Sequence, residues 1–351
     1  MDLVEKAVVV SFIAVICLSI YLMVQLGPAA RKIGLVDNPD ERKQHGASIP
    51  VIGGISIFIA IALSLMLLPF GLGVHRFLLF SSGLLMIVGV LDDHRDISAK
   101  YKAVAQVFVA GILVFGGDVE VTKVGDIFNW RDGNEQGLNW LASPLTVIAV
   151  VGVINAFNFI DGHDGLAASM FLLTAGALIL LCGFDGEWHF QILLGVYALS
   201  VGVFLCFNLP WIVGKSRQIF LGDAGSMFLG LVLVYSLIVL SETEVPTLKS
   251  TSAPWLLGLP LLDMCAVIIL RLARRVSLVS ADRRHIHHLL TRHGYSKKKT
   301  LLFLIVLQGV CCTIGVIGTV RNISDVVLFW SLFPTLLLYI YLRHRWLSVQ
   351  K

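Results

Sequence analysis

Two apolar runs joined by a short polar segment make up residues 141–182, LASPLTVIAVVGVINAFNFIDGHDGLAASMFLLTAGALILLC. Each run approaches the length of about 20 apolar residues that an α-helix needs to cross a bilayer. The joining segment, residues 161–165, contains two aspartates and two glycines but no lysine or arginine. The stretch therefore predicts two membrane-spanning helices connected by an acidic turn.

The rest of the chain repeats this alternation of apolar runs and short polar loops. Of its 351 residues, 57% are hydrophobic and 14% are charged, whereas a soluble domain carries roughly 25% charged residues. The sequence predicts an all-α, polytopic integral membrane protein with a single domain over residues 1–351. We expect eleven spans, or ten if the short fourth or eighth segment does not cross: Ala7–Leu26, Ile49–Phe70, Val74–Leu91, Ala103–Phe115, Leu141–Ile160, Leu166–Cys182, Phe190–Pro210, Met227–Leu240, Ala253–Leu270, Leu301–Val320 and Val326–Leu342.

The distribution of lysine and arginine predicts the orientation in the membrane. With eleven spans, 21 of the 27 basic residues fall in one alternate set of loops. Positive residues are retained on the cytoplasmic side, so we expect a periplasmic N-terminus and a cytoplasmic C-terminus. The net charge of +4 is modest, and the basic residues lie in short loops, which argues against a nucleic-acid partner.

Unusual polar residues gather in the loops assigned to the cytoplasmic side. A carboxylate at the bilayer centre costs about 2.5–3.5 kcal/mol on insertion scales, and a position at a span end avoids most of that cost. Their number suggests a shared cation or a phosphate-bearing substrate. The residues are Asp92, Asp93, Asp96, Asn155, Asn158, Asp161, Asp164, Asp223, Arg283, Arg284, His285, His287 and His288.

Three of these motifs have a chemical interpretation beside an ordinary structural one. Adjacent carboxylates such as Asp92-Asp93 can ligate Mg²⁺ or hold a proton, although such pairs are also common on solvated surfaces. Asn158 and Asp161 are three residues apart and share a face if the helix persists. Arginine beside histidine, as in residues 283–288, suits an anionic ligand. For Lys297, Lys298 and Lys299 we expect only attraction to anionic headgroups.

Taken together and in order, the motifs resemble those of the polyprenyl-phosphate N-acetylhexosamine-1-phosphate transferases. The form His285-Ile-His287-His288 resembles the bacterial N-acetylglucosamine branch, whereas the muramoyl-pentapeptide branch typically has three consecutive histidines. The resemblance extends over residues 37–292 and the span pattern. Its motifs are DNPDERKQH (37–45), PVIGG (50–54), Asp92-Asp93, NAFNFIDGHDGL (155–166), LGDAGS (221–226) and the histidine motif.

The resemblance implies a reaction and its partners. A phosphate oxygen of undecaprenyl phosphate would attack the β-phosphorus of UDP-GlcNAc, and UMP would leave. The product would initiate a cell-envelope polysaccharide, either O-antigen or common antigen. The expected cofactor is Mg²⁺, with Mn²⁺ as a substitute, and the expected location is the bacterial inner membrane with the site facing the cytoplasm. Membrane lipids are further partners, and a homodimer stays open.

The resemblance also implies roles for individual residues. Asn158 and Asp223 would bind the metal, Asp164 would read uracil, and Lys102 would contact phosphate. Asp92 and Asp93 would orient the lipid phosphate, one of them accepting its proton, while Asp161 would support catalysis. The expected diphosphate and sugar clamp and the other substrate-binding residues are His285, His287, His288, Arg284, Lys43 and His45.

Two alternatives stay open at this point. The donor could be another UDP-N-acetylhexosamine, or the polymer could be of the teichoic-acid type. A membrane transporter is the alternative from a different class of protein. Transporters place charges near the bilayer midplane on broken helices, often within repeats, whereas here the charges lie at span ends and no repeat is visible.

Overall fold

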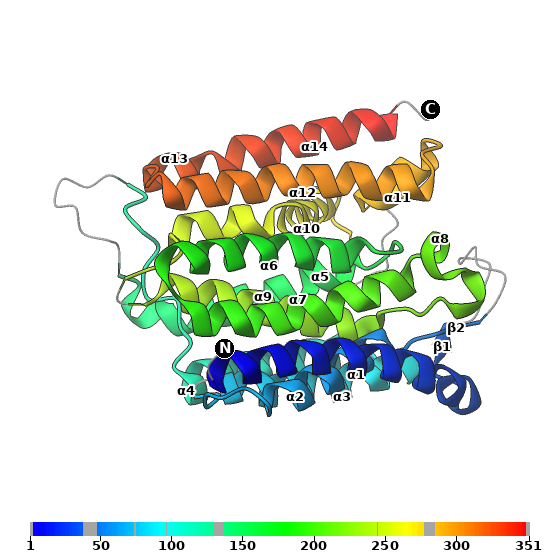
Figure 1. Ribbon diagram of the computed structural model, residues 1–351. Helices are drawn as coiled ribbons and strands as arrows, with labels where there is room; N and C mark the ends of the chain where they lie inside the picture. Colours follow the sequence, from blue (N-terminus) through cyan, green and yellow to red (C-terminus); the bar gives the residue numbers. More distant parts are fainter. Residues whose placement is uncertain are drawn as a thin grey trace.

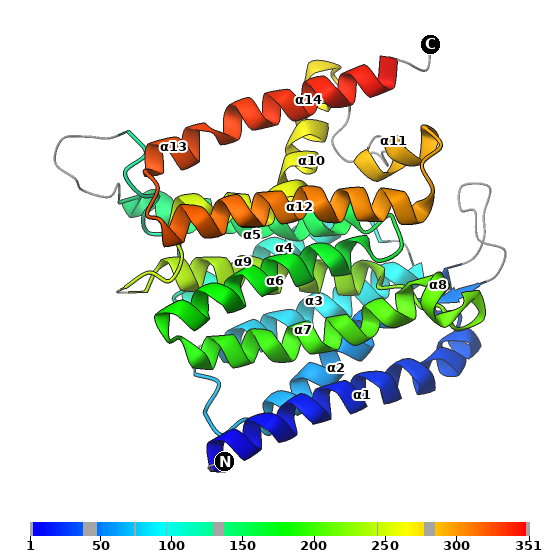
Figure 2. The same cartoon turned by 45° about the horizontal axis from the view of Figure 1, so that its top comes forward.

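The computed structural model describes residues 3–37, 48–73, 75–95, 97–128, 137–243, 245–276 and 285–348. These form one bundle of helices with a short two-stranded antiparallel sheet at one end (Figures 1 and 2). The elements are α1 (Leu3–Ile33), β1 (Val36–Asp37), β2 (Ile49–Pro50), α2 (Gly53–Leu65), α3 (His75–Arg95), α4 (Ala99–Gly117), η1 (Asn139–Leu141), α5 (Ala142–Ile160), α6 (Leu166–Asp185), α7 (Trp188–Asn208), α8 (Pro210–Val213), η2 (Lys215–Arg217), α9 (Gly222–Ser241), η3 (Ser250–Ser252), α10 (Ala253–Ala273), α11 (Ile286–Arg292), α12 (Lys297–Val320), α13 (Asp325–Trp330) and α14 (Leu332–Ser348).

The predicted all-α, polytopic class is confirmed. Within the described residues, 10 helical segments are long and apolar enough to cross a membrane, and the shorter apolar helix α2 accompanies them. Each of the eleven predicted spans coincides with one of these segments. The expectation that the fourth and eighth are short is wrong, because α4 and α9 have 19 and 20 residues. Their first turns carry Lys102 and Asp223, polar residues that the hydropathy pattern had placed in loops.

Among the predicted spans, the one with a short helix is instead the second, whose helix α2 has 13 residues. The predicted span Ile49–Phe70 begins with strand β2, and its helix ends at Leu65, before Pro69 and the glycines at 71 and 73. Proline lacks the N–H that a continuing helix needs, and glycine favours irregular backbone. The segment is therefore part strand, part helix and part loop.

Helix α9 lies at the centre of the bundle. Nearly all of its residues are buried, whereas few residues of the C-terminal span Asp325–Arg345 are buried. Helices α3 and α5 pack along α9, and a Cβ on Gly89 of α3 would lie only 2.2 Å from Cα of Ala224. This close approach brings the last turns of α3 against the first turn of α9, where Asp223 lies.

Helix α10 is broken near its middle. Gly258 has φ 37° and ψ −109°, and Pro260 follows. The side chain of Gln308 on α12 satisfies the freed backbone groups, accepting from Leu259 N at 2.8 Å and donating to Leu256 O at 2.8 Å. Unsatisfied backbone groups cannot persist in an apolar medium, so these bonds make the break a stable feature.

The two chain termini lie at opposite ends of the bundle (Figure 1), as an odd number of crossings requires. One end, on the right in Figure 1, carries β1, β2, α8 and α11, and the other carries α13. We call the first of these the site end. Which end faces the cytoplasm stays a prediction from the distribution of lysine and arginine.

Candidate active site

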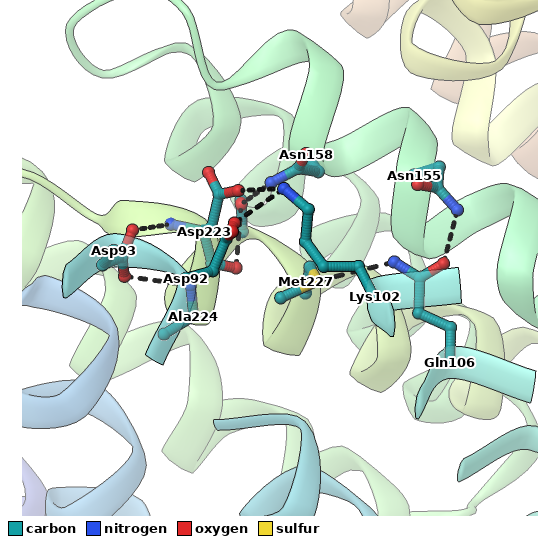
Figure 3. A network of polar contacts seen from close by, with 10 residues as sticks. Asp92, Asp93, Lys102, Gln106, Asn155, Asn158, Asp223, Ala224 and Met227 are labelled. Atoms are coloured by element: carbon teal, nitrogen blue, oxygen red, sulfur yellow. Dashed lines mark hydrogen bonds and ion pairs between the residues drawn. The ribbon is translucent and has the colours of Figure 1, made fainter. Parts of the chain in front are cut away.

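A lysine at the site end joins carboxylates from two other helices. Lys102 Nζ, in the first turn of α4, lies 2.6 Å from Asp92 Oδ2 on α3 and 3.1 Å from Asp223 Oδ2 on α9. Figure 3 shows the ammonium group directed at both carboxylates. The side chain of Asp92 is only 4% exposed. Its charge is costly in such surroundings unless a cation offsets it, and Lys102 supplies that cation.

The neighbouring aspartate faces the backbone of α9 instead. Asp93 Oδ1 accepts from Asp223 N at 2.8 Å, and Oδ2 accepts from Ala224 N at 3.3 Å. The first N–H groups of a helix have no partner within the helix, and the helix dipole favours a carboxylate at that end. Gly222 has φ +79°, and a Cβ there would lie 2.5 Å from Asp93 Oδ2. Glycine at 222 is what allows this contact.

Two asparagines on α5 contribute to different parts of the structure. Asn158 Nδ2 donates to Ser226 Oγ at 3.0 Å, and the same amide group lies next to the Asp223 carboxylate (Figure 3). Asn155, one turn earlier, donates to Gln106 Oε1 at 2.7 Å and so ties α5 to α4 (Figure 3). Asn158 therefore belongs to the carboxylate cluster, whereas Asn155 lies deeper in the helix packing.

The oxygen atoms of this cluster suit a hard divalent cation. No three or more His, Cys, Asp or Glu residues among those described are arranged as a metal site. Mg²⁺ commonly needs only one or two carboxylates, because substrate phosphates and waters complete its octahedron. Asp223 and Asn158 could supply such ligands, and Asp92 Oδ1 is buried with no hydrogen-bond partner in the described part of the chain. An oxygen in that state fits a neighbouring cation or proton.

The loop between α5 and α6 brings Asp161 into the same electrostatic field. Burial raises the pKa of Asp161 well above its usual range, and the negative charges of Asp223, Asp93 and Asp164 raise it further. Asp161 directly follows α5, and its N–H donates to Asn158 O at 3.4 Å. Its carboxyl group is therefore disposed to hold a proton, or to ionise when a cation enters.

Asp164 lies in a second group of contacts, formed by the ends of α6, α7 and α12. Its Oδ1 accepts from Gln218 Nε2 at 3.1 Å, and its Oδ2 pairs with Lys297 Nζ at 2.8 Å. Asn208 accepts from Gly165 N and donates to Ile219 O, and Gln218 donates to Asn208 O. These bonds hold the acidic loop against the segment that precedes α9.

None of these three partners of the Asp164 loop was predicted from the sequence. Lys297 was expected only to attract lipid headgroups, and its pairing with Asp164 corrects that expectation. Asn208 lies at the end of an apolar span, as Asn158 does. This position could have identified Asn208 as a candidate site residue. Gln218 carries no comparable signal, because it is a single amide in a polar loop.

Two of the predicted histidines stand beside this loop. His285 Nδ1 lies 2.7 Å from Asp263 Oδ2 on α10, and its ring lies parallel to the ring of His287 at 6.0 Å. A Cβ on Gly162 would lie 2.3 Å from His287 Nε2, so this imidazole touches the acidic loop. Burial, followed by the charge of His288, lowers the pKa of His287 well below its usual value.

The ring nitrogens of His287 are notable because they are buried without partners. His287 is 2% exposed, and neither nitrogen has a hydrogen-bond partner among the residues that the structure describes. His288 lies next to it, with ring centroids 4.2 Å apart. A neutral imidazole can both donate and accept. His287 therefore offers unmet hydrogen-bonding capacity next to Gly162.

The structure thus brings together at one end Asp92, Lys102, Asn158, Asp161 and Asp223, with Asp93 behind them. Asp164 and the three histidines lie next to this cluster, and the loop at 161–165 connects them to it. The remaining predicted residues, Lys43, His45 and Arg284, lie outside the described residues, as do Asp96 and Arg283.

Comparison with known proteins gives matches of the same kind as the resemblance drawn from the motifs. The family model of glycosyl transferase family 4 matches residues 75–241, a range that contains the carboxylate cluster. The undecaprenyl-phosphate alpha-N-acetylglucosaminyl 1-phosphate transferase of Escherichia coli (strain K12) is 32% identical over 82% of this chain and 78% of its own. The protein of that name from Haemophilus influenzae is 31% identical over 92% of this chain and 91% of its own.

Proposed function

Since the chain belongs to glycosyl transferase family 4, we propose that it transfers N-acetylglucosamine 1-phosphate from UDP-GlcNAc to undecaprenyl phosphate. The products would be UMP and undecaprenyl-diphosphate-GlcNAc, the first lipid-linked sugar of a polysaccharide such as O-antigen or common antigen. We place the reaction at the cytoplasmic face of the bacterial inner membrane. The observation that carries the proposal is the bridge from Lys102 to Asp92 and Asp223 at three helix ends.

Phosphoryl transfer depends mainly on charge neutralisation and alignment. A diphosphate and a lipid phosphate both approach as anions, so the acidic cluster must hold cations to receive them. Lys102 is one such cation. Mg²⁺, bound by Asp223 and Asn158, would be the other, neutralising phosphate oxygens as charge develops on them, and Mn²⁺ would suit the same oxygen ligands.

Asp92 and Asp93 take different roles in this proposal. Both oxygens of Asp93 are occupied by backbone N–H groups of α9, so Asp93 sets the position of the helix that carries Asp223. Asp92 has one oxygen without a hydrogen-bond partner among the described residues, and its other oxygen pairs with Lys102. Asp92 is therefore the better placed of the two to orient the lipid phosphate and accept its proton.

The nucleotide would bind next to the carboxylate cluster, at the Asp164 loop and the histidine motif. Asp164 offers a buried carboxylate whose Oδ2 pairs with Lys297, and that lysine side chain is 63% exposed. An exposed ion pair is weak, so the uracil N–H can replace Lys297 at this oxygen. His287, with unmet hydrogen-bonding capacity, and His285 and His288 would contact the diphosphate and the sugar.

A donor panel tests the proposal and the identity of the sugar together. Detergent-purified protein with Mg²⁺ and undecaprenyl phosphate is supplied with UDP-GlcNAc, UDP-GalNAc or UDP-MurNAc-pentapeptide, and release of UMP is measured. We expect release with UDP-GlcNAc that requires the lipid. Preference for UDP-GalNAc would change the sugar but keep the reaction. Absence of lipid-dependent UMP release with all three donors would refute the proposal.

A further inference from the structure

We propose that Asp263, a buried carboxylate within α10, is a positioning residue that fixes the ring of His285 toward the substrate, and that the C-terminal helix α14 completes this support. Asp263 lies inside an apolar segment and was not among the residues expected to act. This inference rests on the proposed function, because it takes His285 to contact the donor substrate.

Among the described residues, the polar groups that contact the Asp263 carboxylate are hydrogen-bond donors or cations. His285 Nδ1 lies 2.7 Å from Oδ2, and Tyr339 Oη donates to Oδ1 at 2.8 Å. The N–H of Ile286 donates to Oδ1 at 3.3 Å, and Arg343 Nη1 lies 3.6 Å from the same oxygen. Asp263 itself is 1% exposed. Three converging donors and the nearby guanidinium of Arg343 indicate an ionised carboxylate, which can only accept.

The ionised state of Asp263 determines which ring nitrogen of His285 carries the hydrogen. Since Asp263 only accepts, the hydrogen lies on Nδ1, and Nε2 on the opposite edge of the ring is turned away from Asp263. Two aromatic rings flank the imidazole, that of Phe159 at 5.6 Å between centroids and that of His287 at 6.0 Å. The imidazole therefore has one defined orientation and one nitrogen presented to a ligand.

The chemistry explains why an acid persists at this position. A carboxylate within a membrane helix is costly, and a buried ion pair is often no more stabilising than apolar residues of the same size. A contribution to folding stability therefore does not explain why position 263 is an aspartate. The need to orient a substrate-binding histidine does explain it. Carboxylates orient metal-bound histidines in the same way.

Helix α14 contributes two inward-facing side chains to the surroundings of Asp263. Most of this helix is exposed, yet Arg343 is 1% exposed and Tyr339 is 9% exposed. Both contact Asp263. Arg343 balances the carboxylate charge, and Tyr339 fixes the position of Oδ1. The last span of the chain thus supports the histidine motif through Asp263, and Figure 2 shows α14 crossing α10 with α11 nearby.

A double-mutant cycle tests whether Asp263 acts through His285. The variants are Asp263→Asn, His285→Ala and the pair, each assayed for KM and kcat with UDP-GlcNAc. We expect Asp263→Asn to raise KM about tenfold or more, as loss of a charge-assisted hydrogen bond predicts, with a smaller change in kcat. In the His285→Ala background, Asp263→Asn should change KM by less than about twofold, because contacting groups that act as a unit are not additive.

The matched control is Thr174→Val. Thr174 donates to Leu256 O on the same helix α10 at 2.8 Å but does not touch His285, so its loss should lower stability and leave KM unchanged. Asp263→Glu should recover part of the affinity lost in Asp263→Asn. If Asp263→Asn fails to fold, Tyr339→Phe replaces it in the cycle, with a smaller rise in KM.

The outcomes separate this inference from the proposed function. If His285→Ala raises KM but Asp263→Asn multiplies that rise by its full single-mutant factor, Asp263 acts independently of His285 and the inference is overturned. If His285→Ala leaves KM for UDP-GlcNAc unchanged while lipid-dependent UMP release persists, the transfer reaction stands and the role of His285, with that of Asp263, is rejected.

Discussion

Asp93 accepts the backbone N–H of Asp223 at 2.8 Å, so a residue of α3 caps the helix that carries a proposed metal ligand. The adjacent aspartates Asp92 and Asp93 therefore make different contacts at the end of α3. One meets Lys102, and the other holds the first turn of α9. This division allows stability and turnover to be separated by mutation.

Replacement of Asp93 by asparagine should lower both stability and turnover. An amide offers one acceptor oxygen where two backbone N–H groups now find partners, and the loss of a helix cap costs about 0.5–2 kcal/mol. Thermal unfolding in detergent and turnover are measured on the same preparation. Asp92→Asn is the control, because it should reduce turnover without a comparable loss of stability. A stable but inactive Asp93→Asn would instead assign Asp93 to the chemistry.

Replacement of Asp223 by asparagine should abolish turnover at ordinary Mg²⁺ concentrations. The change preserves shape but removes one charge from the proposed metal site. The variant should stay folded and inserted, as judged by size-exclusion chromatography. Turnover close to that of the parent at limiting Mg²⁺ would remove Asp223 from the metal site.

Replacement of Asp164 by alanine should weaken binding of UMP and of the UDP-sugar together, because both carry uracil. The loss of one charge-assisted hydrogen bond costs about 1.5–3 kcal/mol. Calorimetry of UMP binding with Mg²⁺ measures the effect. Lys297→Ala is the matched control, since it removes an exposed ion-pair partner of the same carboxylate and should change UMP affinity only slightly. Unchanged UMP affinity in Asp164→Ala would place base recognition elsewhere.

The predicted orientation is tested by reporter fusions. A reporter after Lys351 should lie in the cytoplasm, and one within residues 132–136, a segment outside the described residues, should lie in the periplasm. The basis is the concentration of 21 of 27 basic residues in one set of loops and the rule that positive loops stay inside. Reports from the same compartment would contradict the arrangement of spans.

Hydropathy and the position of polar residues at span ends predicted much of this fold and site. Runs such as residues 141–160 and 166–182 became helices, and the polar residues that follow or precede them met at one end. The grouping of Asp92, Lys102, Asn158 and Asp223 was foreseeable because each lies at a span end on the same predicted face.

Other features depend on neighbours that the order of the sequence does not reveal. Asp263 lies inside an apolar run, and its proposed role depends on its contacts with His285, Tyr339 and Arg343. These residues follow later in the chain, just before α11 and on α14. The capping role of Asp93 likewise needs α9, far along the chain, to approach α3. The hydropathy pattern also misplaced the starts of α4 and α9, because their polar first turns are paired with each other rather than with water.

The central claim is that the sugar moves together with its phosphate. The most direct measurement uses UDP-GlcNAc labelled with ³²P in the β-phosphate, incubated with the purified protein, Mg²⁺ and undecaprenyl phosphate. We predict that the label passes to the lipid product and that unlabelled UMP is released. Label retained in released UDP, with an unlabelled glycolipid, would show transfer of the sugar alone and would contradict the account.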